Sequence, residues 1–145
     1  FPLITSRIDI SLYIVGASPT AKIMNLESKN VIIKGFLTDD ELQELYDSCR
    51  MVVVPLRYGA GVKGKVLEAM YNGLPVITTS IGAEGIEGIE EIVVVEDEKE
   101  KFARRVCELY AQPDELEKLS IAGQKYMKDN FSLQAVWDVI QPDFC

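Results

Sequence analysis

The stretch RMVVVPLRYGAGVKGKVLEAMYNGLPVITTS, residues 50–80, holds two apolar runs separated by a glycine-rich loop and a helical pattern. The runs RMVVVPL (50–56) and LPVITTS (74–80) predict strands, because continuous Val and Ile are typical of parallel strands that are covered on both faces. Residues 64–72 predict a helix between them. A strand, a helix and a second strand in this order predict a right-handed crossover within a parallel sheet.

The same alternation extends in both directions from this stretch. Three more strands are predicted by ISLYIVG (10–16), NVIIKGF (30–36) and EIVVVED (91–97). Apolar residues recur at helical spacing in the intervening and following segments, which are 19–28, 38–49 (capped by Thr38), 100–112, the segment from Pro113 with buried candidates Leu116, Leu119, Ile121, Ala122 and Met127, and 132–140 (capped by Ser132). This order predicts an α/β fold of Rossmann-like type, with three α/β/α layers around a parallel sheet. No linker composition divides the chain, so we expect residues 1–145 to form one domain.

The composition excludes several classes of function. The chain has 145 residues, of which 48% are hydrophobic and 26% charged, and its formal charge is −8. An acidic chain makes a poor nucleic-acid surface. With no histidine, neither a Ser-His-Asp site nor the commonest metal ligand is available. No apolar run reaches the roughly 20 residues of a membrane helix, and three widely spaced cysteines are typical of reduced thiols. We therefore expect a cytoplasmic location.

Three glycine-rich loops follow predicted strands: GASPT after the first, RYGAGVKGK after the third and SIGAEGIEG after the fourth. In open parallel sheets, ligands bind beyond the carboxyl ends of the strands. Glycines there allow either tight turns or the close approach of a ligand to bare backbone. Both explanations remain open from the glycines alone.

Lys63 and Lys65 stand where the helix 64–72 is predicted to begin. A cation in the first turn of a helix is unfavourable by about 0.3–1 kcal/mol, because the free N–H groups already make that end positive. A phosphate bound there would turn both lysines into charge-assisted donors. The alternative is an ion pair between Lys65 and Glu68 on a solvated face. Glu68 itself fits either a surface residue or a carboxylate that binds ribose hydroxyls.

Two familiar phosphate-binding patterns are absent. Gly64-Lys65 is followed by Val66 and not by Ser or Thr, which argues against a P-loop NTPase. Gly16 is followed by Ala17-Ser18-Pro19, which does not fit the dinucleotide fingerprint.

The segment VVVPLRYGAGVKGKVLEAMYNGLPVITTSIGAEGI (52–86) resembles the donor-binding half of retaining glycosyltransferases of family four, in the GT-B superfamily. LYIVG (12–16), VIIKGFLTDDELQELYDSCRMVVVPL (31–56) and NFSLQAVWDVI (130–140) are also similar to that family. The resemblance implies one of two Rossmann-like domains that face each other across a cleft. This domain binds a UDP- or GDP-sugar, and the amino-terminal acceptor domain is absent from the chain.

The resemblance also assigns site residues. The family has two glutamates with seven residues between them; the second falls on Glu68, which would hold the donor ribose, and the first falls on Ala60, a departure from the pattern. The remaining implied donor-binding residues are Gly61, Val62 and Lys63 at the diphosphate and sugar, Gly35, Phe36 and Leu37 at the base, and Gly16, Gly59, Lys65 and Leu67 nearby. No metal and no cofactor are implied.

Further expectations follow from the resemblance. The family's first strand, and an arginine and a lysine that bind the diphosphate, would precede Phe1, so we expect a piece of a longer enzyme that transfers no sugar by itself. An exposed sheet edge would favour a dimer of this piece. The alternatives are a nucleotide-sugar binding module without catalysis and a GT-B sugar-nucleotide epimerase. The whole enzyme would be cytoplasmic or peripheral to the inner face of the membrane, and its sugar and acceptor stay open.

Overall fold

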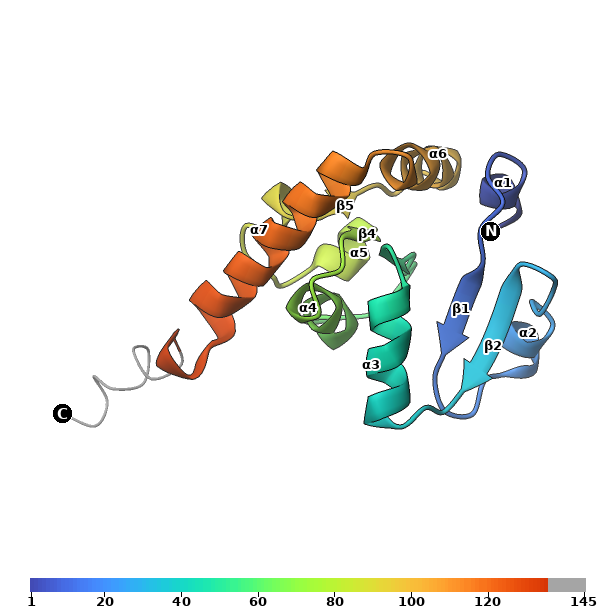
Figure 1. Ribbon diagram of the computed structural model, residues 1–145, viewed down its shortest axis with the longest axis horizontal. Coiled ribbons are helices and arrows are strands. Elements are labelled where there is room, and N and C mark those ends of the chain that lie inside the picture. The colour runs from blue at the N-terminus through green and yellow to red at the C-terminus, as the bar shows by residue number, and fades with distance from the viewer. Residues whose placement is uncertain (136–145) are drawn as a thin grey trace.

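Five short parallel strands and the helices between them make up the computed structural model, which describes residues 1–135 (Figure 1). All five predicted strands are present: β1 (Leu12–Val15), β2 (Val31–Gly35), β3 (Val52–Val54), β4 (Val76–Thr78) and β5 (Val94–Val95). The helices are α1 (Pro2–Thr5), α2 (Ala21–Met24), α3 (Asp39–Ser48), α4 (Gly64–Tyr71), α5 (Ser80–Ala83), η1 (Ile89–Glu91), α6 (Lys99–Tyr110) and α7 (Pro113–Phe131).

The strands pair in parallel, as predicted, but they form two sheets. One sheet holds β1 and β2, with Leu12 opposite Val31. The other has the order β3-β4-β5, with Val52 opposite Val76 and Ile77 opposite Val94. The sheets stay separate because no strand within residues 1–135 pairs with the free edges of both β1 and β3.

The middle strand β4 connects the two halves of the core. Val76 and Ile77 are both fully buried, and their side chains enter different apolar clusters. Val76 packs in the cluster that contains Met70 of α4, and Ile77 packs with Phe102 and Val106 of α6. Because successive side chains of a strand point to opposite faces, α4 and α6 lie on opposite sides of this sheet. This arrangement confirms the three-layer prediction.

The predicted helices differ from the observed ones mainly at their ends. The helix expected over 19–28 is reduced to the four residues of α2. Thr38 caps α3 in a capping box with Glu41. Ser132 accepts a hydrogen bond from the N–H of Ala135, as expected of a cap, and most of the helix predicted over 132–140 lies outside the described residues.

Helix α7 crosses α4 at close range, which Figure 1 shows as a long diagonal helix above α4. A Cβ atom on Gly123 would lie 3.4 Å from the side chain of Met70. The hydroxyl of Ser120 donates to the carbonyl oxygen of Gly73 at 2.5 Å. Leu116 is buried as predicted, but Ile121 is 61% exposed, because Gly123 and not Ile121 faces α4.

Candidate functional site

The loop between β3 and α4 carries most of the predicted site residues. Gly61 has a φ angle of 74°, a conformation in which side chains are strained and glycine is not. Gly59 also has a positive φ angle, and a Cβ atom added to it would lie 3.4 Å from the side chain of Lys63. These two glycines let the chain fold back beside the first turn of α4.

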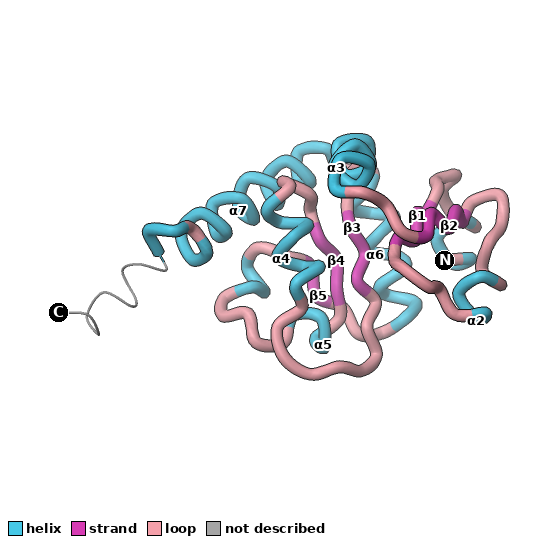
Figure 2. The backbone as a smooth tube through the Cα atoms, turned by 90° about the horizontal axis from the view of Figure 1, so that it is seen from below, coloured by secondary structure: helices cyan, strands magenta, loops and turns pink. Residues whose placement is uncertain are grey.

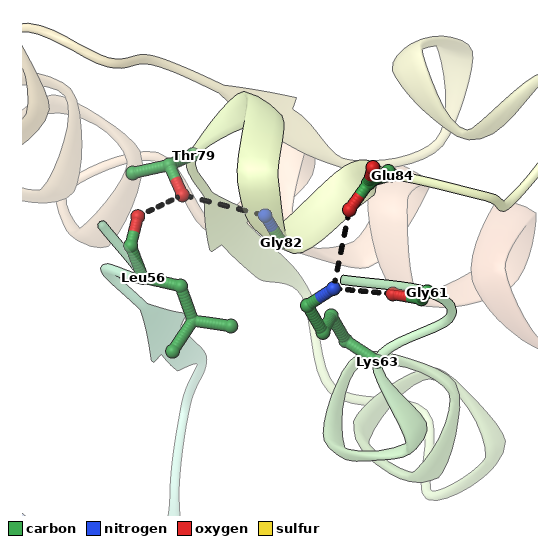
Figure 3. A network of polar contacts seen from close by, with 6 residues as sticks. All are labelled: Leu56, Gly61, Lys63, Thr79, Gly82 and Glu84. Carbon is green, nitrogen blue, oxygen red and sulfur yellow. Dashed lines mark hydrogen bonds and ion pairs between the residues drawn. The ribbon is translucent and has the colours of Figure 1, made fainter. Parts of the chain in front are cut away.

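Lys63 is the residue immediately before α4, and its side chain folds back over the loop. It is 9% exposed although it carries an ammonium group. The ammonium donates to the carbonyl oxygen of Gly61 and lies 3.5 Å from a carboxylate oxygen of Glu84 (Figure 3). The positive charge beside the helix end is therefore balanced by Glu84 in this structure. Lys65 alone occupies the first turn, since Lys63 is the N-cap residue.

Glu84 reaches Lys63 because the end of β4 is fastened to the end of β3. The hydroxyl of Thr79 donates to the carbonyl oxygen of Leu56 at 2.6 Å and accepts from the N–H of Gly82 at 3.4 Å (Figure 3). A Cβ atom on Gly82 would lie 1.9 Å from the hydroxyl oxygen of Thr78, so only glycine fits without a shift. Helix α5 therefore begins tightly against the sheet and delivers Glu84 to the glycine loop.

The two loops also touch beside this ion pair. A Cβ atom on Gly85, whose φ angle is 78°, would lie 3.2 Å from a methyl carbon of Val62. Val62 itself is 52% exposed. Sequence reasoning identified the glycine cluster SIGAEGIEG at this edge but missed Glu84, and the only available signal was an acidic residue among glycines.

Lys65 and Glu68 do not form the ion pair that was one of the two sequence alternatives. Both side chains are exposed, and none of the ion pairs within residues 1–135 joins them. Glu68 instead accepts a hydrogen bond from the hydroxyl of Tyr46 on α3. Burial, followed by the charge of Glu68 and this hydrogen bond, raises the pKa of Tyr46 to about 12. The neighbouring Leu67 is half-buried against the α4 cluster, so it has a packing role.

The other predicted residues lie at the ends of β1 and β2. The N–H of Gly16 donates to the carbonyl oxygen of Gly35 at 2.8 Å, and Gly35 has a φ angle of 67°. Phe36 is 75% exposed and Leu37 is half-buried. No hydrogen bond or ion pair of the described chain links this group to the Lys63 loop. The structure thus places the predicted residues in two groups and joins only Gly59, Gly61, Val62 and Lys63 into one contact network.

Neither of two surface cavities, of about 270 and 210 Å³, is lined by a predicted site residue. Within residues 1–135, no three or more His, Cys, Asp or Glu side chains are grouped so that they could hold a metal ion. In the same range, no helix combines the length and the apolar character needed to cross a membrane.

Comparison with known proteins places the fold and the loop in a known context. A family profile described as glycosyl transferases group 1 matches residues 1–112. An uncharacterized 44.6 kDa protein in the cps region of Klebsiella pneumoniae is 31% identical over 105 residues, covering 71% of this chain and 27% of that protein. The chain therefore belongs to the group 1 glycosyl transferases.

Two solved structures show the same fold. The crystal structure of TarM superposes with a TM-score of 0.79 at 15% identity, covering 99% of this chain and 30% of TarM. Sucrose-phosphate synthase from Thermosynechococcus elongatus gives a TM-score of 0.80 at 19% identity, covering 99% of this chain and 40% of the synthase. These matches confirm the predicted GT-B type of α/β fold. The chain spans well under half the length of these relatives.

Proposed function

We propose that this chain is the donor-binding part of a retaining glycosyltransferase of family four, which uses a UDP- or GDP-sugar. The observation that carries the proposal is the amino-terminal end of α4. That end has no side-chain hydrogen-bond cap and no acidic residue in its first turn, while Lys63 and Lys65 stand beside it. Free N–H groups together with two ammonium groups form a favourable site for the diphosphate of the donor.

Ligand binding at this end requires a change at Lys63. Its ammonium now contacts Gly61 and Glu84. A diphosphate lying over Gly61 would offer oxygens of higher charge, so Lys63 would exchange Glu84 for phosphate. Lys65 is already exposed and needs no such exchange. Gly59 and Val62 would border the diphosphate and the sugar.

The remaining predicted residues would hold the nucleoside. Glu68 would accept hydrogen bonds from the ribose hydroxyls, at the cost of its contact with Tyr46. Gly35, Phe36 and Leu37 would border the base, and Gly16 would lie at the neighbouring strand end. In the transfer step, negative charge grows on the leaving diphosphate as the sugar gains oxocarbenium character. Ammonium groups and helix N–H groups stabilise that charge without a metal ion.

The acceptor side of the reaction would belong to the rest of the protein. Relatives of this chain are much longer, since it covers 27% of the Klebsiella protein and 30% of TarM. We propose that the whole protein adds an acceptor domain and works in polysaccharide biosynthesis on the cytoplasmic side of the membrane. The cps region named for the relative supports this role.

A second candidate is a nucleotide-sugar binding module without catalysis. The observation that favours it is Ala60, an exposed residue without a carboxylate where the family pattern has its first glutamate. An epimerase would need additional acid and base residues, and none is evident in this loop.

Calorimetry with UDP and GDP on the whole protein tests the binding site. Because a charge-assisted hydrogen bond contributes about 1.5–3 kcal/mol, Lys65→Ala and Glu68→Ala should each weaken binding by about tenfold or more. Lys118→Ala on α7 is the matched control, since that lysine pairs only with Glu115 at the surface. Unchanged affinity in both site variants would refute the assignment. Release of free sugar in a screen of nucleotide sugars would separate a transferase from a binding module.

A further inference from the structure

The two sheets present unpaired edges to each other. In β1, the N–H groups of Leu12 and Gly16 donate toward β2. Backbone N–H groups alternate in direction along a strand, so those of Tyr13 and Val15 point to the opposite edge. In β3, the N–H of Val52 donates to Pro75 beside β4, so that of Val53 points away from β4. Among residues 1–135, β1 pairs only with β2 and β3 only with β4.

A cavity of about 210 Å³ lies where these edges face one another. Figure 2 shows β3 on the side of its sheet nearest to β1, with β2 farther away. The lining joins both edges to the face of α6, and it includes Leu12, Tyr13, Met51, Val53, Val106 and Tyr110. A mostly apolar cleft between two open edges favours an extended apolar segment, because such a segment satisfies backbone groups on both sides and buries its own side chains.

We propose that this cleft holds a β-strand supplied by the whole protein from the chain that precedes α1. The strand would run parallel to β1 and join the two sheets into one. A parallel neighbour of β1 needs a crossover connection, which is usually a helix. Helix α1 stands directly before β1, and its Ile4 packs against Phe102 and Val106 of α6. It therefore occupies the place of the last turn of that crossover.

The length of the relatives agrees with this source. The chain covers 30% of TarM and 40% of the sucrose-phosphate synthase, although 99% of it superposes on each. A second copy of this chain is a competing occupant. It would have to insert a strand parallel to β1 from another molecule, whereas a preceding segment is already tethered beside the cleft by α1.

Photo-crosslinking in the whole protein tests the identity of the occupant. The probe p-benzoylphenylalanine would replace Tyr13, which lines the cleft, and in a control protein Tyr71, which is 71% exposed at the end of α4. We expect the position-13 probe to attach within one molecule to a segment that precedes residue 1, and the control to give no such product. A product between two molecules, or one with a segment after residue 135, would overturn the proposal.

Hydrogen exchange of the same protein supplies an independent measurement. The amides of Tyr13, Val15 and Val53 should exchange at least about 100-fold more slowly than an exposed loop amide such as that of Gly61, and nearly as slowly as that of Ile77 in β4. Exchange at the rate of the loop would show an empty cleft and would overturn the proposal, whatever the crosslinks show.

Discussion

The ammonium group of Lys63 lies 3.5 Å from a carboxylate oxygen of Glu84, and the two residues come from loops that follow adjacent strands β3 and β4. The lysine is almost fully buried, whereas the side chain of Glu84 is 52% exposed. Glu84 therefore balances a charge that would otherwise stand unpaired beside the positive end of α4. The same carboxylate competes with any anion for Lys63.

Removal of the charge on Glu84 should strengthen the binding of nucleotide diphosphate. A partly exposed ion pair contributes about 0–1 kcal/mol, so Glu84→Gln in the whole protein should lower the Kd for UDP or GDP by about two- to fivefold. Calorimetry measures this change, and Glu115→Gln on α7 is the control at a comparable surface pair. Weaker binding in Glu84→Gln would mean that Glu84 contacts the ligand or holds the loop in its binding form.

Substitution of Gly82 should destabilise the fold from the start of α5. In Gly82→Ala the new Cβ atom would meet the hydroxyl of Thr78, which is fully buried and donates to Val54. Overpacking of this kind costs about 1–3 kcal/mol, and urea unfolding would measure it. Gly64→Ala is the matched control, because a Cβ atom there meets nothing within 4 Å. Equal stability of the two variants would contradict the tight contact between α5 and β4.

Tyr46 should make the stability depend on pH in the alkaline range. Its pKa is about 12 in the folded protein, above the ordinary value of 10.0. The folded state then holds the phenolic proton more tightly than the unfolded state, so the free energy of unfolding falls as the pH rises from about 10 to about 12. Tyr46→Phe should flatten this fall, as measured by urea unfolding at several pH values. Tyr58→Phe, at a tyrosine that is 86% exposed, should leave it unchanged.

A matched change at Glu68 tests the cause of that shift. Glu68→Gln removes the nearby negative charge and should lower the pKa of Tyr46, while burial, the first cause, remains. Spectrophotometric titration of the tyrosines follows this change. A titration identical to that of the unmodified protein would separate Glu68 from Tyr46, and would leave its carboxylate free for ribose without any exchange.

Residues 1–145 by themselves should transfer no sugar. They lack the acceptor domain that we propose for the whole protein, and donor binding in GT-B enzymes takes place in a cleft between two domains. Incubation with radiolabelled UDP- and GDP-sugars and a polysaccharide acceptor would detect any product, with the whole protein as the positive control. Product formation by residues 1–145 at a rate near that of the whole protein would disprove this division of labour.

Local patterns in the sequence were sufficient to predict the alternation of strands and helices. Runs such as Val52–Val54 and Val76–Thr78 form strands, and Thr38 begins α3, because β-branched runs and caps act within a few residues. The position of the glycine loop before α4 follows from the same kind of signal. The predicted exposure of Glu68 on α4 follows from helical periodicity.

Only the tertiary structure decided what those residues contact. Lys63 and Glu84 are 21 residues apart, and Tyr46 reaches Glu68 from a different helix. Whether five parallel strands form one sheet or two depends on which strands have neighbours on both edges, and a strand's own sequence carries no record of this. Short-range order is fixed by backbone and side-chain preferences, whereas ion pairs and sheet edges depend on distances that exist only once the chain has packed.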